Sequence, residues 1–526
     1  MRLRLTKAGR MVLFAFIAVV LCVGGFFGYQ HFADKGADLI GSFGTDSLGS
    51  NANTPNKENA TTNTPSQNVD VSSPVINLSL DEWIGWKPII DANQGLTTQP
   101  GSIFDELGIK VNINIINDAD ASSNALIKGD LNAAGYTINR TAFLSSKFKD
   151  AGIDVVMPVF TNYSNGGDGI IALSKFETIE SLVDAKIGVP KFSEAQSLVV
   201  WFINKSDLPD SDKQKIINNL ILLDDAEQTG QAFFAGKLDV AATWQPFLSN
   251  AENSTNSHIL FDTTSSNKLI MDGILFRNDF AQAHPDIVSK FIDGVFKAES
   301  MYVTEFDYIR AVMPMFADAS DEDIKSQCGD AGLMGYSKNV SALEDDCPTV
   351  YADMCTIWES IGENVDRSLG ATLFDTSYVK ALSNSYSSLP QASTFEITQE
   401  QKESVKNAAA LLSKSVTLNF MPDLAKFVDN AEADAVLKEF VGMANTLDGA
   451  IIQIEGNVNE RNATETGQRL SEERAKTVKN YFVANGIDPN RIIVVGNGNS
   501  KMLVDPGSNN TDKNRRTDIF FKTIES

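Results

Sequence analysis

The sequence predicts an N-terminal transmembrane helix followed by two folded domains, the first of the α/β class and the second of the α+β class. Three observations predict this: an uncharged apolar run near the N-terminus, strand-like runs alternating with helix-like runs over residues 75–389, and a mixed pattern over residues 402–526. A length of 526 residues accommodates two or three domains, each with a core of its own.

Residues 11–29 contain no charged side chain and are long enough to cross a bilayer. Basic residues within residues 1–10 predict a cytoplasmic N-terminus and an external remainder. A cleaved signal peptide is the alternative, but its apolar core is shorter, and residues 30–37 offer no small-x-small cleavage site. We therefore expect a single-pass membrane anchor, with the bulk of the chain in the periplasm or cell wall space.

Two polar segments divide the rest of the chain. Residues 30–74 form a predicted flexible linker, rich in Ser, Asn, Thr and Pro from residue 41 onward and too poor in large apolar groups to fold. A second predicted linker covers residues 390–401. The domains expected between and after these linkers are residues 75–389 and 402–526.

Composition excludes several functions. A net charge of −24 argues against a nucleic-acid partner, because phosphate neutralisation needs clustered Lys and Arg. At most one disulfide can form among the three external cysteines, and neither these nor the three histidines are spaced as metal ligands. We expect no metal, no cofactor and no catalytic residue. The three cysteines are Cys328, Cys347 and Cys355.

Alternating strands and helices in the first domain indicate a doubly wound sheet. The strand-like runs include VINLSL, VNINII, DVVMPVF and AKIGVP, and the helix-like runs include SEAQSLVVWFINK, KQKIINNLILL and AEQTGQAFFAGK. In the second domain the expected order is a helix (403–414), a strand (416–420), a helix (432–447), a strand (450–456), a helix from 470, and strands at 491–496 and 517–521.

The second domain resembles the OmpA C-terminal family, which binds peptidoglycan. The resemblance is carried by LSEERAKTVKNYFVANGIDPNRIIVVGNG and NRRTDIFF, and extends over about residues 410–523. It implies a βαβαβ fold with a groove for the diaminopimelate of the wall stem peptide. In the family an Arg of the LSxxRA helix meets the ligand's carboxylate, and Arg474 occupies that position. An Asp meets the ligand's ammonium, and here the matching residue is Asn459.

These substitutions and matches have physical consequences. A guanidinium binds a carboxylate through two parallel hydrogen bonds, whereas the amide of Asn459 lacks the charge that strengthens a bond to an ammonium. Arg515 and Arg516 carry the NRR motif, in which one Arg supports the pocket and the other points outward. The alternatives are that Arg474 lies over the core or pairs with a nearby Glu, and that the NRR arginines are surface charges.

The first domain is similar to ABC-transporter substrate-binding proteins of the taurine, sulfonate, nitrate and thiamine-precursor branch. The similarity lies in SNALIKGDLNAAGYT, GGDGIIALSKFETIESLVDAKIGVP and AGKLDVAATWQPFLSNA. It implies the two-lobed α/β periplasmic-binding fold of type II, with crossovers near 161–167 and 262–272 and a small-molecule solute bound between the lobes.

Ligands in such folds lie at the carboxyl ends of strands and at helix N-termini, which selects a set of candidates. The tryptophans among them have the alternative of being core residues, and Ser193 that of being only a helix cap. The candidate ligand-binding residues are Trp86, Tyr136, Thr137, Asn165, Ser193, Ser197, Trp244 and Gln245, with Trp83 a weaker one.

Two functions compete at this point. The first is the receptor of an ABC transporter, with a permease as partner, for a small organic or oxyanion solute; it is tethered to the membrane and bound to the wall. The second is a wall-anchored sensing or docking protein whose binding domain feeds no transporter. An intact polar cleft favours the first, and a cleft filled by side chains favours the second.

Overall fold

The computed structural model describes residues 74–301, 305–386, 398–408, 410–418, 420–421 and 423–523. The predicted anchor at residues 11–29 lies outside these residues, as does the linker up to residue 73. Over the described residues, no helix has both the length and the apolar character needed to cross a membrane.

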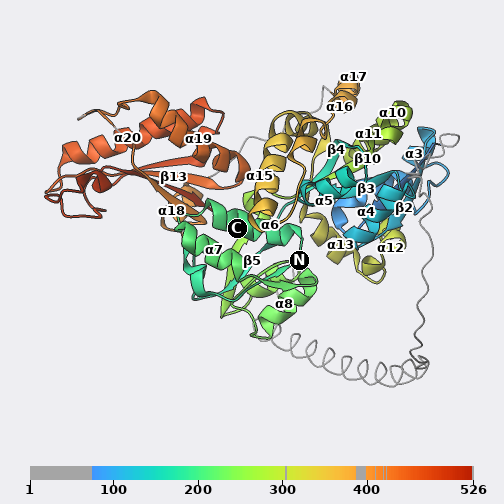
Figure 1. Cartoon of the computed structure of the whole chain (residues 1–526), viewed down its shortest axis with the longest axis horizontal. Coiled ribbons are helices and arrows are strands. Elements are labelled where there is room, and N and C mark those ends of the chain that lie inside the picture. Colours follow the sequence, from blue (N-terminus) through green and yellow to red (C-terminus); the bar gives the residue numbers. More distant parts are fainter. Residues whose placement is uncertain are drawn as a thin grey trace, which may run out of the picture. The chain divides into compact units, whose positions relative to one another are not determined.

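The first lobe is built on a six-stranded sheet in the order β11-β4-β10-β3-β1-β2 (Figure 1). Strand β1 is parallel to both β2 and β3, while β10 is antiparallel to β3 and β4 and lies between them. The strands are β1 (Val75–Leu80), β2 (Lys110–Ile115), β3 (Ala133–Thr137), β4 (Val155–Ser164), β10 (Met271–Arg277) and β11 (Ala331–Leu333).

The second lobe is built on a five-stranded sheet in the order β7-β6-β8-β5-β9. The chain enters it between β4 and β5 and leaves it between β9 and β10, so β10 is inserted into the first sheet after the return. The chain thus passes twice between two α/β lobes, as the sequence resemblance implies. The strands are β5 (Asp168–Leu173), β6 (Ile187–Pro190), β7 (Ile221–Leu223), β8 (Val240–Trp244) and β9 (Ser257–Asp262).

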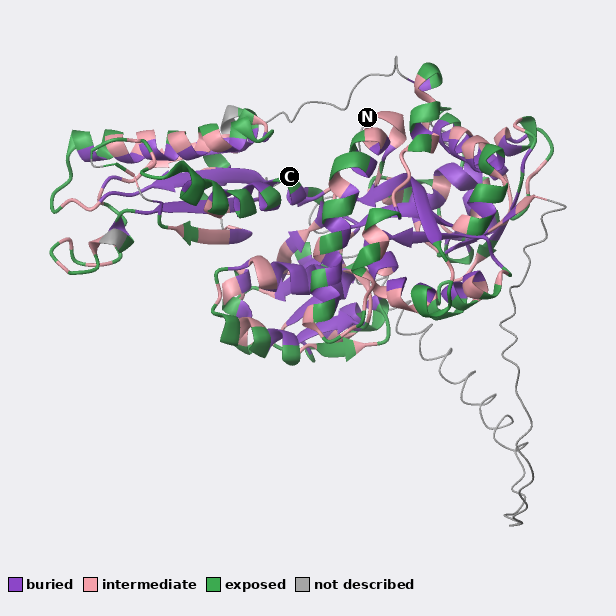
Figure 2. Ribbon diagram, turned by 45° about the horizontal axis from the view of Figure 1, so that its top comes forward, coloured by how far each residue is buried: buried purple, intermediate pink, exposed green. Residues whose placement is uncertain are grey.

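Helices cover both sheets, and the strands are buried beneath them (Figure 2). The second lobe carries α6 (Glu194–Lys205), α7 (Asp210–Asn218), α8 (Ala226–Phe234) and α9 (Phe247–Glu252). The first lobe and the segment after it carry α2 (Lys87–Asn93), α3 (Ile103–Glu106), α4 (Ala119–Lys128), α5 (Ile138–Asp150), α10 (Asn278–Ala283), α11 (Pro285–Met301), α12 (Asp307–Val312), α13 (Asp321–Cys328), α14 (Gly335–Ser341), α15 (Cys347–Ser360), α16 (Ser377–Ala381) and α17 (Ser383–Tyr386).

Helices α5 and α6 both begin at side-chain caps. Thr137 accepts a hydrogen bond from the backbone N–H of Arg140 and starts α5, and Ser193 accepts one from Gln196 and starts α6. Each cap satisfies a backbone donor that the first turn of a helix leaves free. The helices therefore begin next to the ends of β3 and β6, near the passages between the lobes.

The C-terminal domain has a four-stranded sheet in the order β12-β15-β13-β14, with α19 and α20 on the same side of it (Figure 1). Strands β13 and β14 are parallel, and β15 is antiparallel to β12 and β13. The elements are α18 (Gln399–Asn407), β12 (Leu412–Val416), α19 (Asn430–Thr446), β13 (Ile451–Gly456), α20 (Glu465–Ala484), β14 (Ile492–Gly496) and β15 (Thr517–Lys522).

The start of this domain differs from the sequence prediction. The expected helix over 403–414 ends at Asn407, and the expected strand at 416–420 is replaced by β12, which begins four residues earlier. The reason is pairing: β12 runs alongside β15 from Leu412 opposite Phe521 to Val416 opposite Thr517. Long-range pairing with β15 thus overrides the local helical pattern of 408–414.

Candidate functional site

Five charged residues meet where the two lobes face each other, and we call this set the interlobe junction. Asp81 follows β1, Arg140 lies in the first turn of α5, Asp168 begins β5, Glu194 begins α6, and Asp272 is the second residue of β10. Electrostatic interactions connect all of them, since Asp81, Asp168 and Glu194 each act on Asp272, and Arg140 acts on Asp81 and Glu194.

Side chains bind across this junction. The Glu194 carboxylate accepts hydrogen bonds from Arg140 Nε at 3.2 Å and Nη2 at 2.9 Å, and from Thr137 Oγ1 at 2.8 Å. Asn139 Nδ2 donates to Ser197 Oγ at 2.8 Å. Helix α5 of the first lobe therefore contacts the start of helix α6 of the second lobe through charged and neutral bonds.

The three aspartates of the junction have neutral donors instead. Trp86 Nε1 donates to Asp81 at 2.6 Å, and Ser164 Oγ donates to Asp168 at 2.7 Å. Trp83 Nε1 donates to Asn162 Oδ1 at 2.8 Å, and the Trp83 indole also acts as a hydrogen-bond donor toward Asp272, which lowers the pKa of that carboxyl. No cation among the described residues forms an ion pair with any of these three carboxylates.

Loss of water raises the pKa of all three aspartates. Desolvation raises the pKa of Asp168 to about 7 and that of Asp272 well above its ordinary value, and neighbouring carboxylates raise both further. Desolvation also raises the pKa of Asp81, although this residue is exposed. For Glu194, Arg140 outweighs desolvation and lowers the pKa.

The predicted candidates of the first lobe border this junction. Tyr136 is buried, donates to Ser122 Oγ at 2.7 Å, and has its pKa raised by burial to about 12. Trp86 is 1% exposed, so its ring is a core residue and its indole N–H alone reaches Asp81. Thr137 both caps α5 and donates to Glu194.

The candidates of the second lobe and the passages have varied surroundings. Ser193 caps α6 and donates to the carbonyl of Pro190, and Ser197 is fully buried against Asn139. Asn165 donates to the carbonyl of Gly329 at 3.1 Å. Trp244 is 48% exposed. Gln245 accepts from Ser249 and makes a long 3.4 Å contact to the carbonyl of Gly166. Their role as ligand contacts stays a prediction.

The sequence analysis missed the five charged residues, although Asp81 directly follows a predicted strand and Glu194 lies in the first turn of a predicted helix. An acidic residue at the end of VINLSL, in GGDG, after the cap Ser193 and in MDG was the available signal. Their convergence depends on the insertion of β10 beside β3, which a one-dimensional pattern does not contain.

The C-terminal domain gathers a second set of polar residues. Arg474 on α20 is 7% exposed, stacks on the Phe420 ring with its guanidinium carbon 5.0 Å from the centroid, and donates to the carbonyl of Leu424 at 3.2 Å. Desolvation and the nearby charge of Arg515 lower its pKa, while Asp423 raises it. Arg474 is therefore a desolvated cation beside a second cation, and neither has an ion pair among the described residues.

Asn459 is connected to this pair through the chain that carries the NRR motif. Its Oδ1 accepts a hydrogen bond from Asn514 Nδ2 at 2.8 Å, and Asn514 directly precedes Arg515. Arg516 instead is buried, binding Asp518 at 2.9 Å and the carbonyl of Lys501 at 3.1 Å. Thus Arg515 is exposed beside Arg474, while Arg516 holds the neighbouring chain.

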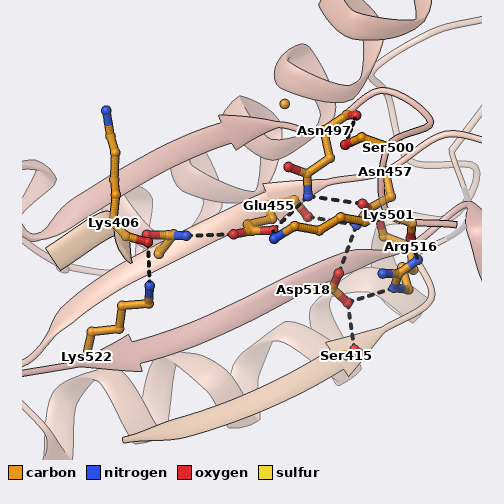
Figure 3. A network of polar contacts seen from close by, with 12 residues as sticks. Lys406, Ser415, Glu455, Asn457, Asn497, Ser500, Lys501, Arg516, Asp518 and Lys522 are labelled. Carbon is orange, nitrogen blue, oxygen red and sulfur yellow. Dashed lines mark hydrogen bonds and ion pairs between the residues drawn. The ribbon is translucent and has the colours of Figure 1, made fainter. Parts of the chain in front are cut away.

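A polar network connects residues of β12, β13 and β15 with the chain that follows β14 (Figure 3). Glu455 accepts from Lys501 and Asn497, each at 2.7 Å, and Asp518 accepts from Asn457 at 2.9 Å and from Ser415 at 2.6 Å. Because Lys501 and the amide groups satisfy the Glu455 carboxylate, and lower its pKa, it is not available to replace the missing Asp at position 459.

Glycines allow α20 to approach this sheet closely. A Cβ at Gly456 would lie 1.9 Å from the carbonyl oxygen of Ser471, and one at Gly496 would lie 2.8 Å from the backbone nitrogen of Glu472. Gly456 and Gly496 are paired between β13 and β14. The turn of α20 that precedes Arg474 therefore rests directly on backbone.

The described cysteines and the possible metal ligands are relevant to the sequence expectation. No group of three His, Cys, Asp or Glu residues there is arranged to hold a metal ion. Cys328, Cys347 and Cys355 are free thiols, and desolvation raises the pKa of each.

The described residues form two α/β lobes and a smaller α+β domain, and each part gathers a set of polar residues. The model of the OmpA family matches residues 419–517. Outer membrane protein A of Bordetella avium is 30% identical over 135 residues, which is 25% of this chain and 67% of that protein. Through its C-terminal domain, the chain belongs to the OmpA family.

Two further similarities were found. The photosystem I P700 chlorophyll a apoprotein A2 of Gloeobacter violaceus is 29% identical over 155 residues, which is 26% of this chain and only 17% of that protein. The periplasmic aliphatic sulphonate binding protein SsuA of Escherichia coli has a similar structure, with a TM-score of 0.45 and 13% identity, over 58% of this chain and 98% of that one.

Proposed function

We propose that the chain is an extracytoplasmic solute-binding protein whose C-terminal domain binds peptidoglycan. In this proposal residues 11–29 tether it to the membrane, residues 75–389 bind a small solute between two lobes, and residues 402–526 hold it to the wall. The single observation that carries it is the interlobe junction, where ionisable groups from both lobes converge at strand ends and helix N-termini, as ligand sites in such sheets do.

Wall binding is supported by the pair Arg474 and Arg515. Two desolvated or adjacent guanidinium groups without an ion pair among the described residues suit a ligand carboxylate, and Arg474 is held rigid by Phe420 and Leu424. We propose that this pair binds a carboxylate of the stem peptide, with Asn459 as a neutral partner on the far side and Arg516 as support. The wall domain would then depend more on carboxylate than on ammonium recognition.

Co-sedimentation tests the wall-binding half, and ligand-induced stabilisation tests the solute-binding half. The full-length protein, purified in an uncharged detergent, should sediment with purified peptidoglycan, and its melting temperature should rise saturably with a suitable solute. A ligand at a hundred times its dissociation constant stabilises a protein by about 2.7 kcal/mol, which is easily measured. If the protein neither sediments with peptidoglycan nor is stabilised by any solute, the proposal is wrong.

A sensing or docking protein is the second candidate, and one observation favours it. Arg140, Thr137 and Asn139 already bind Glu194 and Ser197 across the junction, so side chains occupy part of the space a solute would need. The two candidates differ in their partner. Crosslinking in cells would capture a membrane permease complex with the transport receptor, and a different protein or none with the docking protein.

A further inference from the structure

The passage by which the chain returns from the second lobe to the first makes contacts that the proposed function does not use. This return passage comprises residues 263–270, between β9 and β10. Thr263 Oγ1 pairs with Ser164 Oγ, at the end of β4, at 2.8 Å, and it accepts a hydrogen bond from the N–H of Gly166, in the outgoing passage, at 2.9 Å. Because the two passages are bonded together at Thr263, a restraint on one of them also restrains the other.

A turn of the C-terminal domain contacts the return passage. The turn, residues 446–450, joins α19 to β13. Ser266 Oγ donates to the carbonyl of Thr446 at 2.5 Å, and the Asn267 N–H donates to Asp448 Oδ1 at 2.7 Å. One side chain and one backbone group of the passage are therefore bonded to the turn.

Glycine at position 449 brings the two segments together at the level of the backbone. The Gly449 N–H donates to the carbonyl of Ser265 at 3.1 Å, and a Cβ at position 449 would lie 2.2 Å from the carbonyl oxygen of Thr264. Gly449 does not have a positive φ, so the close approach alone requires glycine there. Any other residue at this position would separate the turn from the passage.

The turn is held in place from within the C-terminal domain. Arg491 is buried and donates to the carbonyls of Ala444 and Ala450, each at 3.0 Å, and to that of Leu447. The planar guanidinium thus fixes the backbone on both sides of Asp448. The return passage is therefore contacted by a turn whose shape is already set.

We propose that the C-terminal domain acts as a clamp on the return passage, so that docking of this domain and movement of the two lobes are coupled. In two-lobed proteins the segments that cross between the lobes absorb the change in backbone angles when the lobes move. Hydrogen bonds that hold residues 265–267 oppose that change, and a coupling of this kind acts in both directions. The proposal goes beyond the proposed function, in which the two domains act separately.

Hydrogen exchange of the full-length protein, purified in an uncharged detergent, tests the clamp. Gly449→Ala places a methyl group against the Thr264 carbonyl, and we expect the amides of residues 263–269 to exchange about tenfold faster than in the wild type. The amides in the first turn of α6, which is bonded to α5 of the other lobe, should exchange faster as well. Gly442→Ala is the matched control and should change neither segment, because a Cβ there meets no atom within 4 Å.

A second variant keeps the test decisive if Gly449→Ala does not fold. Asp448→Ala removes the acceptor of the Asn267 N–H without adding volume, and it should produce the same two increases in exchange. Unchanged exchange at residues 263–269 would show that the domain does not dock on the passage, and the proposal would be wrong. Faster exchange in the passage with unchanged exchange in α6 would show docking without coupling, which overturns the clamp.

Discussion

The carboxylate of Glu194 and the guanidinium of Arg140 form a two-point ion pair that joins the two lobes of the central domain. Both side chains are about four-fifths buried, with exposed fractions of 20% and 23%. The pair places a protein carboxylate at the start of α5.

Breaking the Arg140–Glu194 pair should lower the stability of the protein. Glu194→Gln removes the charge but keeps an oxygen for Thr137, and we expect the free energy of unfolding to fall by about 1–3 kcal/mol, since Arg140 is left partly buried without its partner. Urea denaturation of the single variants and of the Arg140→Gln/Glu194→Gln double variant measures the coupling. A double variant as destabilised as the sum of the singles would mean that the pair contributes nothing.

The junction should make stability depend on pH. The folded-state pKa of Asp168, about 7, lies above its unfolded value of 3.8, so the folded protein binds the proton more tightly. The contribution of Asp168 to the free energy of unfolding is fully present below about pH 4 and is lost as pH rises to about 7. It amounts to at most about 4 kcal/mol. Urea titrations at pH 4, 5.5 and 7 measure the free energy of unfolding, which should fall less with rising pH in Asp168→Asn than in the wild type. Parallel curves for variant and wild type would contradict it.

Arg474 should control binding to the wall. Arg474→Ala should reduce co-sedimentation with peptidoglycan at least tenfold, because a desolvated guanidinium contributes more than about 1.4 kcal/mol to holding a carboxylate. Arg469→Ala, an exposed position on the same helix, should leave binding unchanged. Since Arg474 also stacks on Phe420, Arg474→Lys serves as a second variant that keeps the charge. Full binding by the Ala variant would exclude Arg474 from the site.

A substitution at position 459 should strengthen binding to peptidoglycan, whereas Arg474→Ala weakens it. Asn459→Asp keeps an oxygen for Asn514 and adds the charge that an ammonium prefers, so we expect affinity for peptidoglycan rich in diaminopimelate to rise about tenfold. Peptidoglycan whose stem peptides carry lysine instead provides the comparison in the same assay. Equal affinity of variant and wild type for both walls would show that the ammonium does not reach this residue.

The adjacent arginines of the NRR motif should have different effects. Arg516→Met removes a buried ion pair with Asp518 and a bond to the Lys501 carbonyl, and should destabilise the C-terminal domain by about 3 kcal/mol. Arg515→Met, on the exposed neighbour, should change stability by less than about 0.5 kcal/mol while weakening wall binding. Equal loss of stability in the two variants would mean that Arg515 is also structural.

Much of this architecture follows from local pattern. The strands at 75–80 and 187–190 and the long helix that carries Arg474 are where alternation, β-branched runs and apolar spacing predict them. The segment around 403–420 does not follow its local pattern, because its strand is selected by pairing with β15 at the far end of the domain.

Some candidate site residues could likewise be found from local sequence, and others could not. Arg474 and Asn459 could be found because a motif fixes them in sequence, whereas Asp168 and Asp272 lie a hundred residues apart and meet through two crossovers and the insertion of β10. Trp244 also lies in a conspicuous motif, its side chain is 48% exposed, and its role as a ligand contact stays a prediction.

The glycine pair beneath α20 limits how this domain can vary. At Gly456 and Gly496 the backbone of one helix turn occupies the volume that any other residue needs. A library that randomised both codons and was screened for folded, wall-retained protein would return glycine at 456 in nearly every survivor and little beyond glycine at 496. Sequence drift in this domain is therefore confined at two positions where the neighbouring backbone leaves no room for a methyl group.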